Sequence, residues 1–289
     1  MDAFICITCG TQFAPSQKPP ELCPICTEER QYVPPSGQAW ITLSKLSKSH
    51  MLSIRDETGI LGLGISPNFG IGQRALLVQT PHGNVLWDCI SLVNDTTVRL
   101  VNGLGGLHAI AISHPHYYTT MVEWSRAFGG IPVYVHAADR DWVMRPDPAV
   151  ELWEGDLYEI VPGLNLIRCG GHFEGGTVLH WAKGSNGKGA LLTGDILQVT
   201  ADRKHLAFMR SYPNFIPLGG RTVQKIADRI APWQFDVIYG AFWNLVISEG
   251  AKQAFDRSVH RHIHWLGQDL ASDIRRSNRG YANLIEMVQ

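Results

Sequence analysis

The sequence predicts a mixed α/β (α+β) fold in which two β-sheets are covered by helices, preceded by a small cysteine-rich module. Hairpin-like apolar runs in the first third of the chain give way to alternating strand and helix patterns. Two Cys-x-x-Cys pairs lie within the first 26 residues. Histidine and aspartate side chains directly follow three of the apolar runs. This mixture favours two packed sheets over a barrel of parallel strands.

Length and composition indicate one large globular domain with a small appendage. The chain has 289 residues, of which 45% are hydrophobic and 18% charged. Its net charge of −1 argues against nucleic acid as a partner, and no apolar run reaches membrane-spanning length. The first residues lack the features of a secretory signal. We therefore expect a cytoplasmic protein with no membrane segment; a homo-oligomer is compatible with the sequence.

The cysteine-rich module has the spacing of a zinc ribbon. Its cysteines form two pairs separated by 13 residues: Cys6, Cys9, Cys23 and Cys26. Each pair can present two sulfurs from one tight turn, and two such turns complete a tetrahedral thiolate site. Disulfides are the alternative, which a cytoplasmic location disfavours. The sequence predicts a structural zinc ion here, with iron as the alternative, in a ribbon spanning residues 1–38.

The main domain is expected over residues 39–289, after a hinge at 34–37. Apolar, β-branched runs predict strands at 75–79, 85–89, 107–113, 131–136, 164–169, 178–181, 190–193 and 236–239. Helical periodicity predicts helices at 96–102, 118–128, 221–230 and 251–266. The glycine-rich stretches 62–64 and 103–106 lack phosphate-loop spacing and are predicted to be turns.

Three of the predicted strands end in metal-ligand side chains. The residues concerned are His114, His116, His172 and Asp195. Three imidazoles and a carboxylate are a complete donor set for a tetrahedral zinc ion. A lone histidine is more often a packing or surface residue, but the recurrence after separate strands favours metal binding. The sequence therefore predicts a second zinc site, in the main domain.

From about residue 58 onward the chain resembles the metallo-β-lactamase fold superfamily. The resemblance is carried by the order Trp87-Asp88-Cys89, His114-Pro115-His116, His172 and Thr193-Gly194-Asp195. It implies a four-layer αββα sandwich with the metal site at one edge of the two sheets. It also implies that Asp88 lies beneath the metal and accepts a hydrogen bond from a ligand imidazole. The superfamily includes β-lactamases, thioester hydrolases, lactonases, nucleases and some oxidoreductases, so the fold leaves the substrate open.

The sequence departs from the superfamily at one metal position. The usual His-x-His-x-Asp-His string has Tyr118 and Thr119 in place of its final aspartate and histidine. The late histidine of the same position is also missing from residues 238–243. These departures predict a mononuclear site. The alternative is a replacement ligand supplied by His260, His262 or His264.

The expected function is that of a zinc-dependent hydrolase acting on a small, largely apolar substrate. Zinc with three imidazole ligands lowers the pKa of bound water from 15.7 to about 7, which makes hydroxide available at neutral pH. Asp195 is expected to orient the water or take its proton, and Tyr118 to donate a hydrogen bond to the developing anion. The candidate pocket walls are Phe173, Trp124, Phe242 and Trp243.

The sequence is compatible with several substrate classes. The resemblance implies ester, lactone or thioester hydrolysis, and some enzymes of the superfamily hydrolyse isothiocyanates, which is the most specific prediction. The alternative is a non-catalytic scaffold or interaction protein with a vestigial metal site, because a zinc ribbon is often a contact module.

Overall fold

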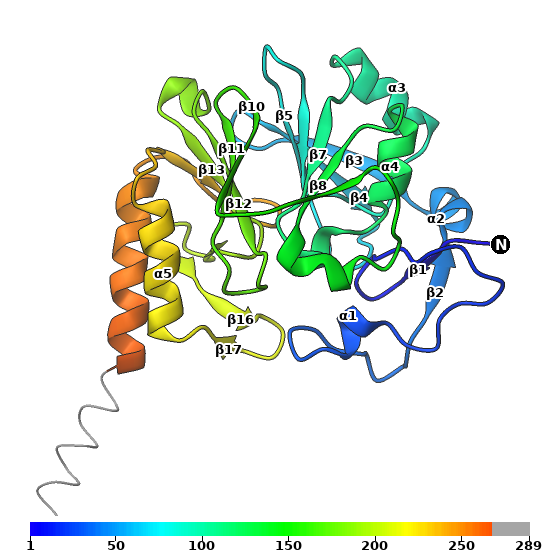
Figure 1. The fold of residues 1–289 in the computed structure, drawn as a ribbon, viewed down its shortest axis with the longest axis horizontal. Coiled ribbons are helices and arrows are strands. Elements are labelled where there is room, and N and C mark those ends of the chain that lie inside the picture. The colour runs from blue at the N-terminus through cyan, green and yellow to red at the C-terminus, as the bar shows by residue number, and fades with distance from the viewer. Residues whose placement is uncertain (268–289) are drawn as a thin grey trace, which may run out of the picture.

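Two β-sheets pack face to face between outer layers of helices (Figure 1). The computed structural model describes residues 1–267, so the end of the predicted domain 39–289 lies outside the described residues. The first sheet contains, in spatial order, β3 (Met51–Asp56), β4 (Leu61–Ser66), β5 (Ala75–Val78), β6 (Val85–Trp87), β7 (Ala109–Ala111), β8 (Val133–His136) and β9 (Val150–Trp153). The second contains β10 (Leu157–Val161), β11 (Leu164–Arg168), β12 (Thr177–Trp181), β13 (Ala190–Leu192), β18 (Val237–Tyr239) and β19 (Val246–Ile247).

The layers follow from the two-residue period of the strands. In β6, Val85 and Trp87 face the core between the sheets, whereas Leu86 faces the helices on the other side. In β18, Val237 and Tyr239 face the same central core, and Ile238 faces the opposite helical layer. Both sheets are thus buried on both faces, which explains why their strands are continuously apolar. The αββα sandwich predicted from the resemblance is confirmed.

Five helices form the outer layers. The first sheet is covered by α2 (Leu43–Ser49), α3 (Asp95–Gly103) and α4 (Met121–Ala127). The second is covered by α5 (Gly220–Ile230) and a helix over residues 251–267. In α5 the buried residues are Val223, Ile226, Ala227 and Ile230, which is the spacing of a single apolar face. Within residues 1–267, no helix is long and apolar enough to cross a membrane.

The predicted central strands and helices are present within a few residues, but other elements were missed. Within the two sheets, the sequence did not predict strands β3, β4, β9, β10 and β19. Outside the sheets it did not predict two strand pairs, β14 (Gln198–Val199) with β15 (Leu206–Ala207) and β16 (Met209–Ser211) with β17 (Ile216–Pro217). Short 3₁₀ helices occur at η1 (Pro115–Tyr117), η2 (Ala137–Trp142) and η3 (Ser185–Gly187). The helix predicted from residue 118 begins only at Met121, because η1 precedes it and Thr119 has a positive φ of 34°.

The prediction of a turn at residues 62–64 was wrong. Gly62 and Gly64 lie inside β4, where the indole of Trp243 packs directly on the strand. A Cβ at Gly64 would lie 2.6 Å from an indole carbon. The glycines are therefore needed for close packing rather than for a change of chain direction.

The amino-terminal module is a ribbon that pairs with the start of the main domain. Strand β1 (Phe4–Cys6) is antiparallel to β2 (Trp40–Thr42), and the short helix α1 (Pro24–Thr27) carries the second cysteine pair. Because β2 lies just after the boundary predicted at residue 38, the β1–β2 pairing joins the ribbon to the start of the main domain. The ribbon cysteines and Ile25 form a small buried cluster of their own.

Candidate metal centre

The four predicted ligands of the main domain meet at one edge of the sandwich. They lie on the segments that follow β7, β11 and β13: His114, His116, His172 and Asp195, here termed the histidine–aspartate cluster. Each side chain offers a ligand atom, and these atoms all lie within 4.8 Å of one another. All four residues are buried. The sequence thus identified four side chains that the fold brings together.

The distances within the cluster fit a metal ion. The Nδ1 atom of His116 lies 3.3 Å from Nε2 of His172. Two nitrogens at the usual zinc distance in a tetrahedral site would lie about 3.3–3.4 Å apart. The Nε2 atom of His114 and the Oδ1 atom of Asp195 are buried and have no hydrogen-bond partner. Buried polar atoms are normally satisfied, so these atoms are suited to ligate a cation.

Hydrogen bonds from the surrounding chain orient two of the imidazoles. Nδ1 of His172 donates to the carbonyl of Met209 at 3.0 Å, which leaves Nε2 free for a ligand bond. Nδ1 of His114 lies 2.8 Å from the hydroxyl oxygen of Ser113. These contacts set the ring directions before any ion binds.

Asp88 acts on the cluster through Ser113. Its Oδ1 accepts a hydrogen bond from the backbone N–H of Ser113 at 2.8 Å. The predicted direct hydrogen bond from a ligand imidazole to Asp88 is absent, because Ser113 contacts the His114 ring instead. Gly194 makes this packing possible, since a Cβ there would lie 2.4 Å from the Ser113 hydroxyl oxygen.

Burial keeps the three imidazoles of the cluster neutral. It lowers the pKa of His172 to about 4 and those of His114 and His116 well below their ordinary value. Neutral imidazoles are the form that binds metals. Burial also raises the pKa of Asp195 to about 7, with a further contribution from Asp88. A cation among these groups would favour the charged carboxylate.

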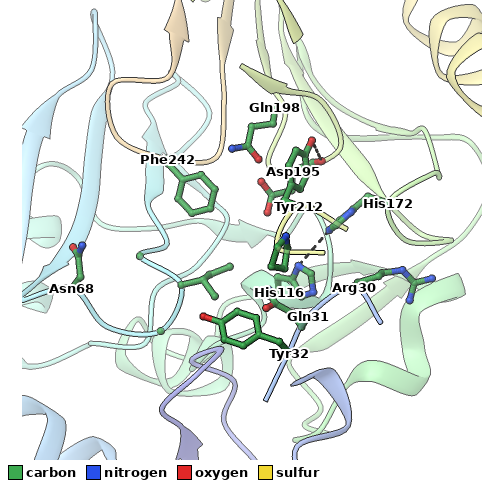
Figure 2. Close-up of a pocket in the computed structure, with 14 residues that line it drawn as sticks. Arg30, Gln31, Tyr32, Asn68, His116, His172, Asp195, Gln198, Tyr212 and Phe242 are labelled. Carbon is green, nitrogen blue, oxygen red and sulfur yellow. Dashed lines mark hydrogen bonds between the residues drawn. The ribbon is translucent and has the colours of Figure 1, made fainter. Parts of the chain in front are cut away.

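A cavity of about 400 Å³ opens beside the cluster (Figure 2). His116, His172 and Asp195 contribute to its lining. The other lining residues come from separate segments of the chain: Arg30, Gln31, Tyr32, Asn68, Gly70, Ile71, Gly72, Gln198, Tyr212, Pro213 and Phe242. No sequence signal distinguished the ribbon residues after Cys26 or the loop after β4, because only the fold brings them to this site.

Only one of the four aromatic residues predicted as pocket walls lines the cavity, namely Phe242. Phe173 packs against the imidazoles of the cluster at 5.0–5.6 Å between ring centroids. Trp124 is buried in the core and donates to the carbonyl of Ile90. Trp243 covers β4.

Tyr118 does not have the predicted position. Its hydroxyl is buried and donates to the carbonyl of Asp139 at 3.4 Å. It is also absent from the lining of the cavity. Tyr118, which stands where the superfamily usually has an aspartate, is therefore a core residue and not a hydrogen-bond donor to the substrate.

The three histidines considered as replacement ligands do not join the cluster. All three lie on the helix 251–267. Nε2 of His262 donates to the carbonyl of Leu218 at 2.8 Å, and His260 and His264 are exposed. Among the described residues, the groups of side chains that could hold a metal are the histidine–aspartate cluster and the ribbon cysteines.

The ribbon cysteines are also arranged for a cation. The Sγ atoms of Cys6 and Cys26 are 3.7 Å apart, as are those of Cys9 and Cys23. Sulfurs at about 2.3 Å from a tetrahedral zinc ion would lie about 3.8 Å apart, whereas a disulfide bond is about 2 Å long. Contacts with Cys23 and the other thiols lower the pKa of Cys6 and raise that of Cys9. Full ionisation of the group therefore needs a bound cation.

Comparison with known proteins gives the family of the chain. No protein-family model matches the chain. YmaE of Bacillus subtilis (strain 168), described as an uncharacterised protein, is 46% identical over 273 residues, covering 93% of this chain and 99% of YmaE. The chain belongs to the same family as YmaE.

Solved structures identify the fold. TMB-1 superimposes with a TM-score of 0.54 at 14% identity, over 72% of this chain and 95% of that chain. DIM-1 metallo-β-lactamase gives a TM-score of 0.53 at 15% identity, over 72% of this chain and 95% of that chain. This member of the YmaE family has the metallo-β-lactamase fold.

Proposed function

We propose that this protein is a metal-dependent hydrolase with one zinc ion at the histidine–aspartate cluster. The observation that carries the proposal is the convergence of four buried metal-binding side chains beside a cavity. The cavity includes the exposed residues Asn68 and Tyr32 in its lining, so it is open to solvent. A metal site beside an open cavity is typical of catalysis, whereas structural sites are closed.

The donor set assigns a role to each residue of the site. A zinc ion held by the cluster supplies a Lewis acid that lowers the pKa of water. His172 and His114 are held in place by Met209 and Ser113. Asp195 presents an oxygen without a hydrogen-bond partner. We assign to this carboxylate the orientation of the attacking water and the acceptance of its proton.

The cavity lining supports a small, largely apolar and uncharged substrate. Its walls contain Tyr32, Ile71, Pro213 and Phe242. We therefore propose an ester, lactone or thioester as the substrate, with an isothiocyanate as the most specific candidate. The single-ion proposal is supported by Tyr118, which turns toward Asp139 at a position where the superfamily has a second-site ligand.

Elemental analysis combined with a hydrolysis screen tests the proposal. We expect about two zinc ions per wild-type chain and one in a His114→Ala/His116→Ala variant. The control His260→Ala, which changes an exposed histidine on the last helix, should keep both ions. Three ions in the wild type, with two left in the variant, would contradict the mononuclear site. Iron in the ribbon would appear in the same measurement.

The screen uses esters, lactones, thioesters and isothiocyanates. We expect turnover by the wild type and at least a thousandfold loss in the double variant. A protein with two ions that hydrolyses none of these compounds would favour the scaffold alternative.

A further inference from the structure

The ribbon segment that follows the second cysteine pair is fixed against the main domain beside the metal cluster. Ser211 donates to the carbonyl of Arg30 at 3.1 Å. Asn214 donates to the carbonyls of Glu29 at 2.7 Å and Gln31 at 3.0 Å. These hydrogen bonds hold the backbone of residues 29–31. Residues 29–32 are termed here the exit segment. The exit segment lies directly after the helix that carries Cys26.

Arg30 anchors the exit segment and does not present a free charge to the cavity. Its guanidinium is paired with Glu28 at 3.0 Å and lies 4.2 Å from the ring centre of Phe173. Figure 2 shows this group directed away from the cavity. Phe173 in turn contacts the imidazoles of the cluster. The charge of Arg30 at the lining of the cavity is therefore paired with Glu28, and its guanidinium packs on Phe173.

Aromatic rings from two different parts of the chain flank the cavity. Tyr32, on the exit segment, and Phe242, on the turn between β18 and β19, both line it. Figure 2 shows the two rings apart from each other and on the same side of His116. Tyr32 is 47% exposed, so its ring is accessible from solvent. Gln31 adds a buried carboxamide whose oxygen has no hydrogen-bond partner.

We infer that the ribbon is a substrate-recognition element, whose exit segment selects compounds with a neutral aromatic group held between Tyr32 and Phe242. The ion-binding turns of the ribbon fix the chain on one side of the exit segment, and Ser211 and Asn214 fix it on the other. An uncharged aromatic group can pack against these two aromatic rings without leaving a buried charge unpaired. The inference rests on the proposed function in taking this cavity as the substrate site.

Calorimetric binding of benzamide and acetamide to the zinc-loaded protein tests the inference without any turnover. We expect benzamide to bind the wild type at least tenfold more tightly than acetamide. Tyr32→Ala should raise the benzamide Kd about tenfold, and Tyr32→Phe should restore it. The control Phe215→Ala removes a more exposed aromatic side chain outside the cavity lining and should leave the Kd unchanged.

The ribbon itself is tested with Cys23→Ser. We expect this variant to keep the ion of the main domain, to lose that of the ribbon and to lose the preference for benzamide. Equal binding of both amides by the wild type, or wild-type benzamide affinity in Tyr32→Ala or in Cys23→Ser, would overturn the inference. Intact benzamide binding without hydrolysis in the substrate screen would instead overturn the proposed function.

Discussion

Gln73 links the ribbon to a ligand of the main metal site. Its side-chain Nε2 donates to the carbonyls of Cys9 at 2.6 Å and His116 at 3.0 Å, and the residue is buried. Gln73→Leu removes both donors while approximately preserving volume. A buried carbonyl left without its donor costs about 1–3 kcal/mol, so we expect the free energy of unfolding to fall by about 2–6 kcal/mol. Zinc affinity of the main site should fall about 10–100-fold, because the backbone of His116 loses a support.

Urea unfolding of the zinc-saturated protein measures the first effect, and competition with a chelator measures the second. Gln79→Leu is a matched control, because Gln79 is exposed and makes a single 3.4 Å hydrogen bond to Leu104. It should change stability by less than about 0.5 kcal/mol. A loss below about 1 kcal/mol in Gln73→Leu, or equal losses in the two variants, would refute the proposed coupling.

Two further predictions concern packing and pH. Gly64→Ala places a Cβ 2.6 Å from Trp243 and should lower the free energy of unfolding by about 1–3 kcal/mol, measured in urea. The control Gly103→Ala, with no atom within 4 Å of the new Cβ, should not destabilise the protein. Equal effects of the two variants would contradict the packing argument. Burial raises the pKa of Asp139 from 3.8 to about 6, so the folded state binds this proton more tightly than the unfolded state. The resulting stabilisation, about 3 kcal/mol, is complete below pH 3.8 and is lost as the pH rises through 6. Relative to Asp139→Asn, wild-type stability should therefore fall between pH 4 and 7 in urea titrations, and parallel curves would refute the assignment.

The sequence was most informative where local chemistry and periodicity coincide. Apolar runs predicted the central strands, because a strand buried on both faces is continuously hydrophobic. It was less informative for short or glycine-containing strands such as β4, where the decisive contact comes from Trp243, far along the chain. Tyr118 and Asp88 show the same limit for the site. The sequence singled out both residues but did not indicate their partners, Asp139 and Ser113.

By itself, the sequence indicated which side chains can bind metal ions, because donor type and position after an apolar run can be read from each segment separately. The ribbon cysteines and the histidine–aspartate cluster were all identified in this way. Only the tertiary structure decided what surrounds those donors. Gln73, Tyr32 and Phe242 reach the site from three separate segments. These residues lie far apart in the sequence and are brought to the site by packing of the whole fold, so no local sequence pattern predicts their contacts.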